Sequence, residues 1–223
     1  MSFRIAERQC RPMYGIQGVG VSAVKDGSSA SSTGDAPAPA RGGDVLSDYP
    51  AAWVRSAETT DKAHYRIRPI RSDDSQRELD FISALSPESR YNRVMCARGT
   101  PSGADLEQLV HVDYRNRMAF IAVIDVGGAE RIVGAARYAV DGDRRCEFAV
   151  AVADDWQHRG VGIALCRGLL DYARTRGIEE IHATTLATNH QMIALARALG
   201  MQVQADLADS RIVCASLAHL GSD

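Results

Sequence analysis

The stretch that decides the fold is Val152-Ala153-Asp154-Asp155-Trp156-Gln157-His158-Arg159-Gly160-Val161-Gly162. An apolar strand leads into it, and a long amphipathic helix is predicted to follow, from Val161 to about Arg176. A helix N-terminus presents backbone N–H groups without intrahelical acceptors and carries a partial positive charge. Glycines at that point let a phosphorylated ligand approach the backbone closely. The stretch therefore predicts a pyrophosphate-binding loop, with close helix–strand packing as the alternative reason for the glycines.

Three antiparallel strands are predicted in series before this loop. The first two, Met118 to Val126 and Arg131 to Val140, are joined across Gly127-Gly128, which is a strong hairpin signal. Asp141-Gly142-Asp143 predicts a second tight turn, into a strand from Cys146 to Val152. The loop therefore follows a β-meander, which differs from the strand–loop–helix opening of a Walker motif.

Helices and strands alternate less regularly in the rest of the folded part. Ser72 is predicted to cap one helix, Ser86-Pro87-Glu88 to start a second, and Asn189 to cap a helix whose core face carries Met192, Leu195 and Leu199. A short helix at 104–110 and strands at 64–70, 178–184, 201–205 and 211–217 complete the pattern. We expect a mixed α/β fold with a central, mostly antiparallel, twisted sheet of about seven strands flanked by helices.

The first part of the chain differs in composition from the rest. Residues 27–43 read GSSASSTGDAPAPARGG and contain no large apolar side chain, so burial cannot offset the entropy of ordering them. We expect residues 1–48 to form a disordered tail and linker, and residues 49–223 to form the domain.

Composition excludes several classes of function. The chain has 26 basic and 28 acidic residues, which gives no bulk attraction to nucleic acid or to an anionic membrane. It shows neither a secretory signal nor an apolar run of about 18 residues. The five cysteines (Cys10, Cys96, Cys146, Cys166 and Cys214) form no CxxC pair, and the six histidines show no metal-ligand spacing. We expect a reduced cytoplasmic protein without a metal site and without nucleic-acid or membrane partners.

The deciding stretch resembles a known motif. Gln157-x-x-Gly160-x-Gly162 is similar to the acyl-CoA pyrophosphate loop of the GNAT acetyltransferase superfamily, and Asn189 followed by Leu199-Gly200 resembles a second segment of that family. Three further segments are similar to the catalytic domain of the bacterial protein lysine acetyltransferases called Pat; they are Arg68-Pro69-Ile70-Arg71, Leu85-Ser86-Pro87-Glu88-Ser89-Arg90-Tyr91 and Glu147-Phe148-Ala149-Val150. The resemblance extends from about Tyr49 to Leu217.

The resemblance implies a GNAT fold and direct transfer of an acetyl group from acetyl-CoA to a primary amine. Backbone N–H groups near Val150 would stabilise the oxyanion, because two strands splay apart there in this family. The positions that it assigns to acetyl-CoA binding are Val150, Val152, Gln157, His158, Arg159, Gly160, Val161, Gly162, Ile163 and Asn189.

Glu147 is the candidate general base, because it matches the position of the base in Pat proteins. Strand alternation places it on one face with Ala149 and Ala151, whose small side chains leave room for a substrate. The alternative is an exposed strand residue paired with Arg137 or Arg144. Cys146 next to it is a nucleophile candidate, but direct transfer needs no acyl-enzyme, and a small buried role fits better. Ala196 stands where many family members carry a tyrosine acid, and a thiolate with a pKa near 8.5 can leave without one.

Three functions remain open at this point. Acetylation of protein lysine is the function that we expect, and the alternatives are acetylation of a small amine and a non-catalytic acyl-CoA-binding module. The fold does not fix the acceptor, because acceptor sites are built from variable loops. The sequence leaves open whether the chain is a monomer or a homodimer.

Overall fold

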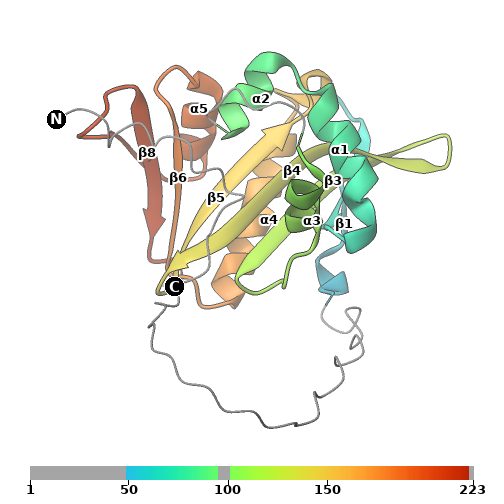
Figure 1. Ribbon diagram of the computed structural model, residues 1–223, viewed down its shortest axis with the longest axis horizontal. Helices are drawn as coiled ribbons and strands as arrows, with labels where there is room; N and C mark the ends of the chain where they lie inside the picture. The colour runs from blue at the N-terminus through green and yellow to red at the C-terminus, as the bar shows by residue number, and fades with distance from the viewer. Residues whose placement is uncertain (1–48, 95–100, 221–223) are drawn as a thin grey trace, which may run out of the picture.

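The computed structural model of the chain describes residues 49–94 and 101–220. The expected disordered tail, residues 1–48, lies outside the described residues. The described part forms one eight-stranded sheet in the order β1-β2-β3-β4-β5-β6-β8-β7 (Figure 1). All neighbouring strands are antiparallel except β5 and β6, which are parallel. The strands are β1 (Arg55–Glu58), β2 (His64–Pro69), β3 (Arg117–Val126), β4 (Ala129–Gly142), β5 (Arg145–Val152), β6 (Glu180–Leu186), β7 (Gln202–Ala205) and β8 (Ile212–Ala218).

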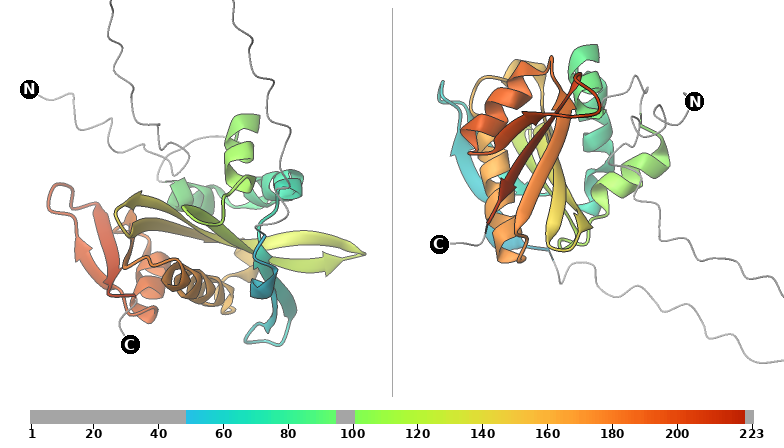
Figure 2. Two further views of the ribbon diagram at one scale, coloured as in Figure 1. Left: turned by 90° about the horizontal axis from the view of Figure 1, so that it is seen from below. Right: turned by 90° about the vertical axis from the view of Figure 1, so that its left-hand side faces the viewer.

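Helices cover both faces of the sheet, so the predicted mixed α/β class is confirmed. Figure 2 shows α1 (Ser75–Ala84), α2 (Pro87–Val94) and α3 (Gly103–Val110) on one face, and α4 (Val161–Thr175) and α5 (His190–Ala198) on the other. The face under α4 holds the larger apolar core, in which Leu165, Leu169 and Phe148 are buried. The face under α1 and α3 holds a smaller one, around Ile70, Phe81 and Ile121.

The sheet has one more strand than expected. The sequence of β1, Arg-Ser-Ala-Glu, lacks the large alternating apolar side chains that indicate a strand, and its residues are half-buried and exposed in turn. Pairing with β2 nevertheless places it at the edge of the sheet, where Arg55 donates a hydrogen bond to the Ala164 carbonyl of α4 at 2.9 Å.

Both predicted turns exist, but one of them lies further along the chain. Gly127 and Gly128 form the two-residue turn between β3 and β4, with φ of 64° and 86°. The second turn was expected at Asp141-Gly142-Asp143. Gly142 instead pairs with Arg145, the register shifts between Val140 and Gly142, and the turn is made by residues 143 and 144. A β-bulge therefore takes up the residue that the sequence pattern assigned to the turn.

The helix starts agree with the sequence at two of three positions. Ser86 caps α2, since its Oγ accepts the Ser89 N–H at 3.1 Å, and Asn189 caps α5, since its Oδ1 accepts the Met192 N–H at 3.1 Å. The expected cap at Ser72 is wrong: Ser72 opens a short 3-10 turn, and α1 begins three residues later. The capping carboxylate at that turn belongs to Asp74, which accepts the Arg71 N–H at 2.8 Å.

An opening between two strands positions the site. The parallel pairing of β5 with β6 joins only residues 145–147 to residues 180–182. Beyond Glu147 the two strands diverge, while β5 stays paired with β4 as far as Val152. The edge of β5 that faces β6 is therefore left open from Phe148 onward, directly before the glycine-containing loop.

Candidate active site

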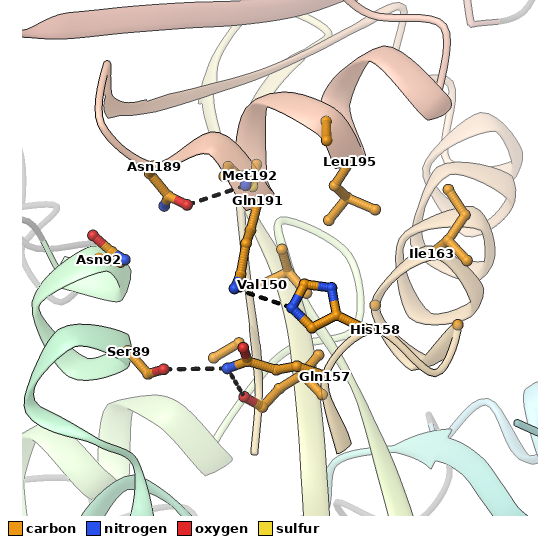
Figure 3. Close-up of a pocket in the computed structure, with 15 residues that line it drawn as sticks. Ser89, Asn92, Val150, Gln157, His158, Ile163, Asn189, Gln191, Met192 and Leu195 are labelled. Carbon is orange, nitrogen blue, oxygen red and sulfur yellow. Dashed lines mark hydrogen bonds between the residues drawn. The ribbon is translucent and has the colours of Figure 1, made fainter. Parts of the chain in front are cut away.

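A cavity of about 350 Å³ lies between β5, the loop before α4, and helices α2 and α5 (Figure 3). Its wall is contributed by segments far apart in the chain. The lining residues are Ser89, Asn92, Val150, Ala151, Val152, Gln157, His158, Gly160, Gly162, Ile163, Asn189, Gln191, Met192, Ala194 and Leu195.

The loop presents backbone donors to this cavity. Gly160 has φ of 88°, in the left-handed region, and stands directly before α4. The first bond of the helix runs from the Ala164 N–H to the Gly160 carbonyl at 3.1 Å. The N–H groups of residues 161–163 therefore have no acceptor within the helix. Together with the helix dipole they form a site suited to an anion such as a pyrophosphate.

All but two of the predicted cofactor-binding residues line the cavity. The exceptions are Arg159 and Val161. The guanidinium of Arg159 pairs with Asp61, at 2.6 Å, and lies over the ring of Trp156, 4.5 Å from its centroid. Val161 is buried in the core beneath α4. Val161 fixes the start of α4 on the core, and Arg159 ties the loop to the connection between β1 and β2.

Gln157, the first residue of the motif, fastens the loop to its neighbours. Its Nε2 donates to the Val152 carbonyl at 3.1 Å and to the Ser89 Oγ of α2 at 3.2 Å (Figure 3). The side chain therefore fixes the distance between the loop and α2.

Asp154 makes the second connection between the loop and α2. Its carboxylate accepts the N–H of Ser86 at 2.8 Å, the Ser86 hydroxyl at 2.9 Å and the Ser89 hydroxyl at 2.7 Å. Burial alone would raise the pKa of Asp154, but the hydrogen bonds from the two serines outweigh it and lower the pKa. We name Ser86, Ser89, Asp154 and Gln157 the loop–helix clasp.

The side chains of α5 that line the cavity were not among the predicted site residues. Met192 and Leu195 were assigned to the core face of α5, but both are half-buried and line the cavity. Gln191 reaches across from the same helix to His158, with 3.3 Å between the two Nε2 atoms. Helical spacing identifies such residues as an apolar face, but it does not distinguish packing against a core from lining a pocket.

Glu147 lies on β5 just before the strands diverge, and it is half-buried rather than exposed. Burial raises the pKa of its carboxyl, and the nearby His182 partly opposes that effect. In the alternative interpretation Glu147 would pair with Arg137 or Arg144. Both arginines have other partners: Arg137 pairs with Glu78 at 2.6 Å and Arg144 with Glu179 at 2.5 Å. Glu147 is therefore a partly desolvated carboxylate beside, but not in, the wall of the described cavity.

Cys146 points to the opposite face of the same strand. It is fully buried, and burial raises the pKa of its thiol to about 12. A thiol in that environment carries almost no thiolate at neutral pH, which is the reactive form. The nucleophile hypothesis has no support, and Cys146 packs as a small apolar side chain.

Two features of the described residues concern metal binding and membrane insertion. Residues 49–94 and 101–220 contain no group of three or more His, Cys, Asp or Glu side chains that could hold a metal ion. Within the same ranges no helix has the length and apolar character required to cross a membrane.

Comparison with known proteins gives consistent results. Residues 87–201 match the family described as Acetyltransferase (GNAT) family. The chain is 40% identical, over 167 residues, to an acetyltransferase of Pseudomonas aeruginosa, covering 74% of this chain and 89% of that protein. It is 32% identical to the acetyltransferase Pat of Mycolicibacterium smegmatis, covering 61% of this chain and 40% of that longer protein. The crystal structure of the GNAT domain of S. lividans PAT superposes with a TM-score of 0.70 at 28% identity, covering 76% of this chain and 99% of that one.

Proposed function

Because the chain belongs to the GNAT acetyltransferase family, we propose that it transfers the acetyl group of acetyl-CoA directly to a primary amine, the side-chain amine of a protein lysine, with Glu147 as the general base. The observation that carries the proposal is a half-buried carboxylate at the point where β5 and β6 part, on the strand that leads into the loop of open backbone donors.

The donor side is supported by the cavity. The N–H groups that follow Gly160 suit the pyrophosphate of acetyl-CoA. The apolar side chains of Val150, Met192 and Leu195 suit the pantetheine arm. This arm would lie along the open edge of β5 and bring the thioester to the N–H groups near Val150.

The acceptor side needs a base. A lysine amine has an unperturbed pKa of about 10.4, so freeing it near neutral pH costs on the order of 4 kcal/mol. Glu147 would take the proton from the ammonium, directly or through one water. The amine nitrogen then forms the C–N bond to the thioester carbon, the C–S bond breaks, and a second proton from the nitrogen ends on the sulfur. Burial raises the pKa of Glu147, so the acid limb of the pH–rate profile should lie above that of an ordinary carboxyl, with activity increasing as pH rises through it.

The choice of protein lysine rests on the resemblance of the Ser86-Pro87-Glu88 and Glu147-Phe148 segments to those of the Pat acetyltransferases. Acetylation of a small amine is the alternative, and binding of acyl-CoA without catalysis is a third possibility. A non-catalytic module has no need of a desolvated carboxylate at this position, which favours an enzyme.

The test measures thiol release from acetyl-CoA, with native protein extract as acceptor in one reaction and its small-amine filtrate in another. We expect release with the protein fraction, and a loss of at least 100-fold in the Glu147→Gln variant, in the range that a general base contributes. The matched control is Glu179→Gln, an exposed carboxylate paired with Arg144, which should turn over like the wild type. Release with the filtrate alone would overturn the lysine assignment, and full activity of Glu147→Gln would overturn the base.

A further inference from the structure

Two further titratable side chains lie beside Glu147 on the same face of the sheet. Parallel pairing of β5 with β6 sets His182 opposite Glu147, and neighbouring strands are about 4.8 Å apart. The His182 Nε2 lies 3.2 Å from Oδ2 of Asp141, which stands at the bulge of β4. Arg145 approaches the same carboxylate, with its guanidinium nitrogens 3.3 Å away. Asp141 is thereby fixed between Arg145 and the imidazole ring.

The two nitrogens of the His182 ring have different surroundings. Nε2 faces the Asp141 carboxylate, whereas Nδ1 is buried and has no hydrogen-bond partner among the described residues. A carboxylate beside one ring nitrogen favours the tautomer that carries the proton on that nitrogen. The lone pair then remains on Nδ1 of the residue that pairs with Glu147 across the two strands. The side chain is 21% exposed, so a proton held by the ring can reach solvent.

The reaction requires a path by which a proton leaves the protein. An ammonium and acetyl-CoA give an amide, a free thiol and one proton, so one of the two protons lost by nitrogen ends on sulfur and the other must leave the protein. The proton that must leave is the one that Glu147 took from the ammonium, and it is still on the carboxyl at the end of the transfer. Burial favours the protonated carboxyl, which slows the return of Glu147 to its basic form.

We propose that His182, oriented by Asp141, accepts on Nδ1 the proton that each turnover leaves on Glu147 and passes it to solvent. The inference rests on the proposed role of Glu147 and adds the step that regenerates the base. No covalent bond to His182 is formed, and the proton leaves as the one released by the overall reaction. His182 acts after acetyl transfer, so it serves turnover rather than substrate capture.

Other titratable groups lie near the ring on the neighbouring strands. Arg145 on β5 is turned toward Asp141, Glu180 lies two positions before His182 on β6, and Cys214 lies on β8 two pairs further along. Within residues 49–94 and 101–220, Asp141 supplies the only ion-pair or hydrogen-bond contact of the ring. Asp141 and His182 therefore form a dyad on the strand next to Glu147 and at the bulge of β4.

The test compares wild type, His182→Gln, His182→Ala and Asp141→Asn at saturating substrates in dilute buffer. We expect kcat of both His182 variants to fall roughly tenfold, less than the loss from removing a general base, while kcat/KM stays close to wild type. Added imidazole should restore kcat of His182→Ala in proportion to its concentration and leave the wild type unchanged. Asp141→Asn should show a smaller loss. His64→Gln, which removes a different carboxylate-paired histidine, is the matched control and should behave as wild type.

Each result decides the question. If kcat of His182→Gln and Asp141→Asn stays at the wild-type level, or if imidazole has no effect on His182→Ala, the proton outlet is wrong. An equal fall in kcat and kcat/KM without rescue would assign His182 a structural role and also overturn it. If His182→Gln does not fold, Asp141→Asn keeps the ring and carries the test. Failure of the base itself would be separate, because Glu147→Gln would then be active.

Discussion

The two halves of the proposed active site are built in different ways. The donor half comes mostly from one continuous segment, Val150 to Ile163, completed by α5. The acceptor half, by contrast, combines Glu147 on β5, His182 on β6 and Asp141 on β4. The geometry of a local segment is set by its own turns and caps. The acceptor half forms only when three strands pair in the correct register. The first half depends on backbone donors and the second on side-chain charges.

The largest effect of a substitution is expected at Gly160, in the donor half. Gly160→Asp places a Cβ at φ of 88° and a negative charge in front of the helix N-terminus, where a phosphate would bind. We expect acetyl-CoA affinity, measured by calorimetry, to fall by about 100-fold or more, which is about 3 kcal/mol. The overall fold should persist, because a Cβ there meets no atom closer than 3.9 Å.

Gly177→Asp is the matched control for that change. Gly177 also has positive φ, 72°, and ends the same helix at the opposite terminus. Both variants carry the same backbone strain and the same added charge, so unchanged affinity in Gly177→Asp would assign the loss to the loop. Tight binding by Gly160→Asp would instead show that the loop does not hold the pyrophosphate.

The same contrast explains what the sequence could predict. The loop, the hairpin at Gly127-Gly128 and the caps at Ser86 and Asn189 are local signals, and each lies where it was expected. Strand β1 carries no such signal, and the bulge at Asp141 arises only from pairing between β4 and β5. The place of His182 beside Glu147 follows from a parallel register between segments 35 positions apart, which no local pattern encodes. The role of Glu147 came from a resemblance and stays a prediction.

A smaller effect is expected at the loop–helix clasp, which joins the donor loop to α2. Asp154→Ala removes the acceptor of three hydrogen bonds from Ser86 and Ser89. Such bonds to a charged but partly exposed group contribute about 1–2 kcal/mol in total, so α2 should loosen without loss of the fold. We expect KM to rise several-fold for both substrates, with kcat falling less. Hydrogen exchange of the α2 amides should accelerate.

Asp155→Ala is the control for the clasp. The Asp155 carboxylate is next in the chain to Asp154, but it is exposed and lies 3.4 Å from Arg131. Its kinetics and its α2 exchange should match the wild type. If both variants behave alike, the donor loop and α2 act independently, and the clasp does not couple them.

The smallest effect is expected at Cys146, which adjoins Glu147 but faces the other side of the sheet. Cys146→Ala removes one buried sulfur and should cost about 1 kcal/mol of stability by the cavity that it leaves, measured by urea unfolding. Turnover should stay at the wild-type level, as it should for Cys166→Ala, an equally buried thiol on α4. Loss of activity in Cys146→Ala alone, with an acetyl group trapped on the wild-type thiol, would replace direct transfer by an acyl-enzyme. Unchanged activity would restrict the reacting groups to the face of β5 that carries Glu147, since alternate residues of one strand serve opposite faces.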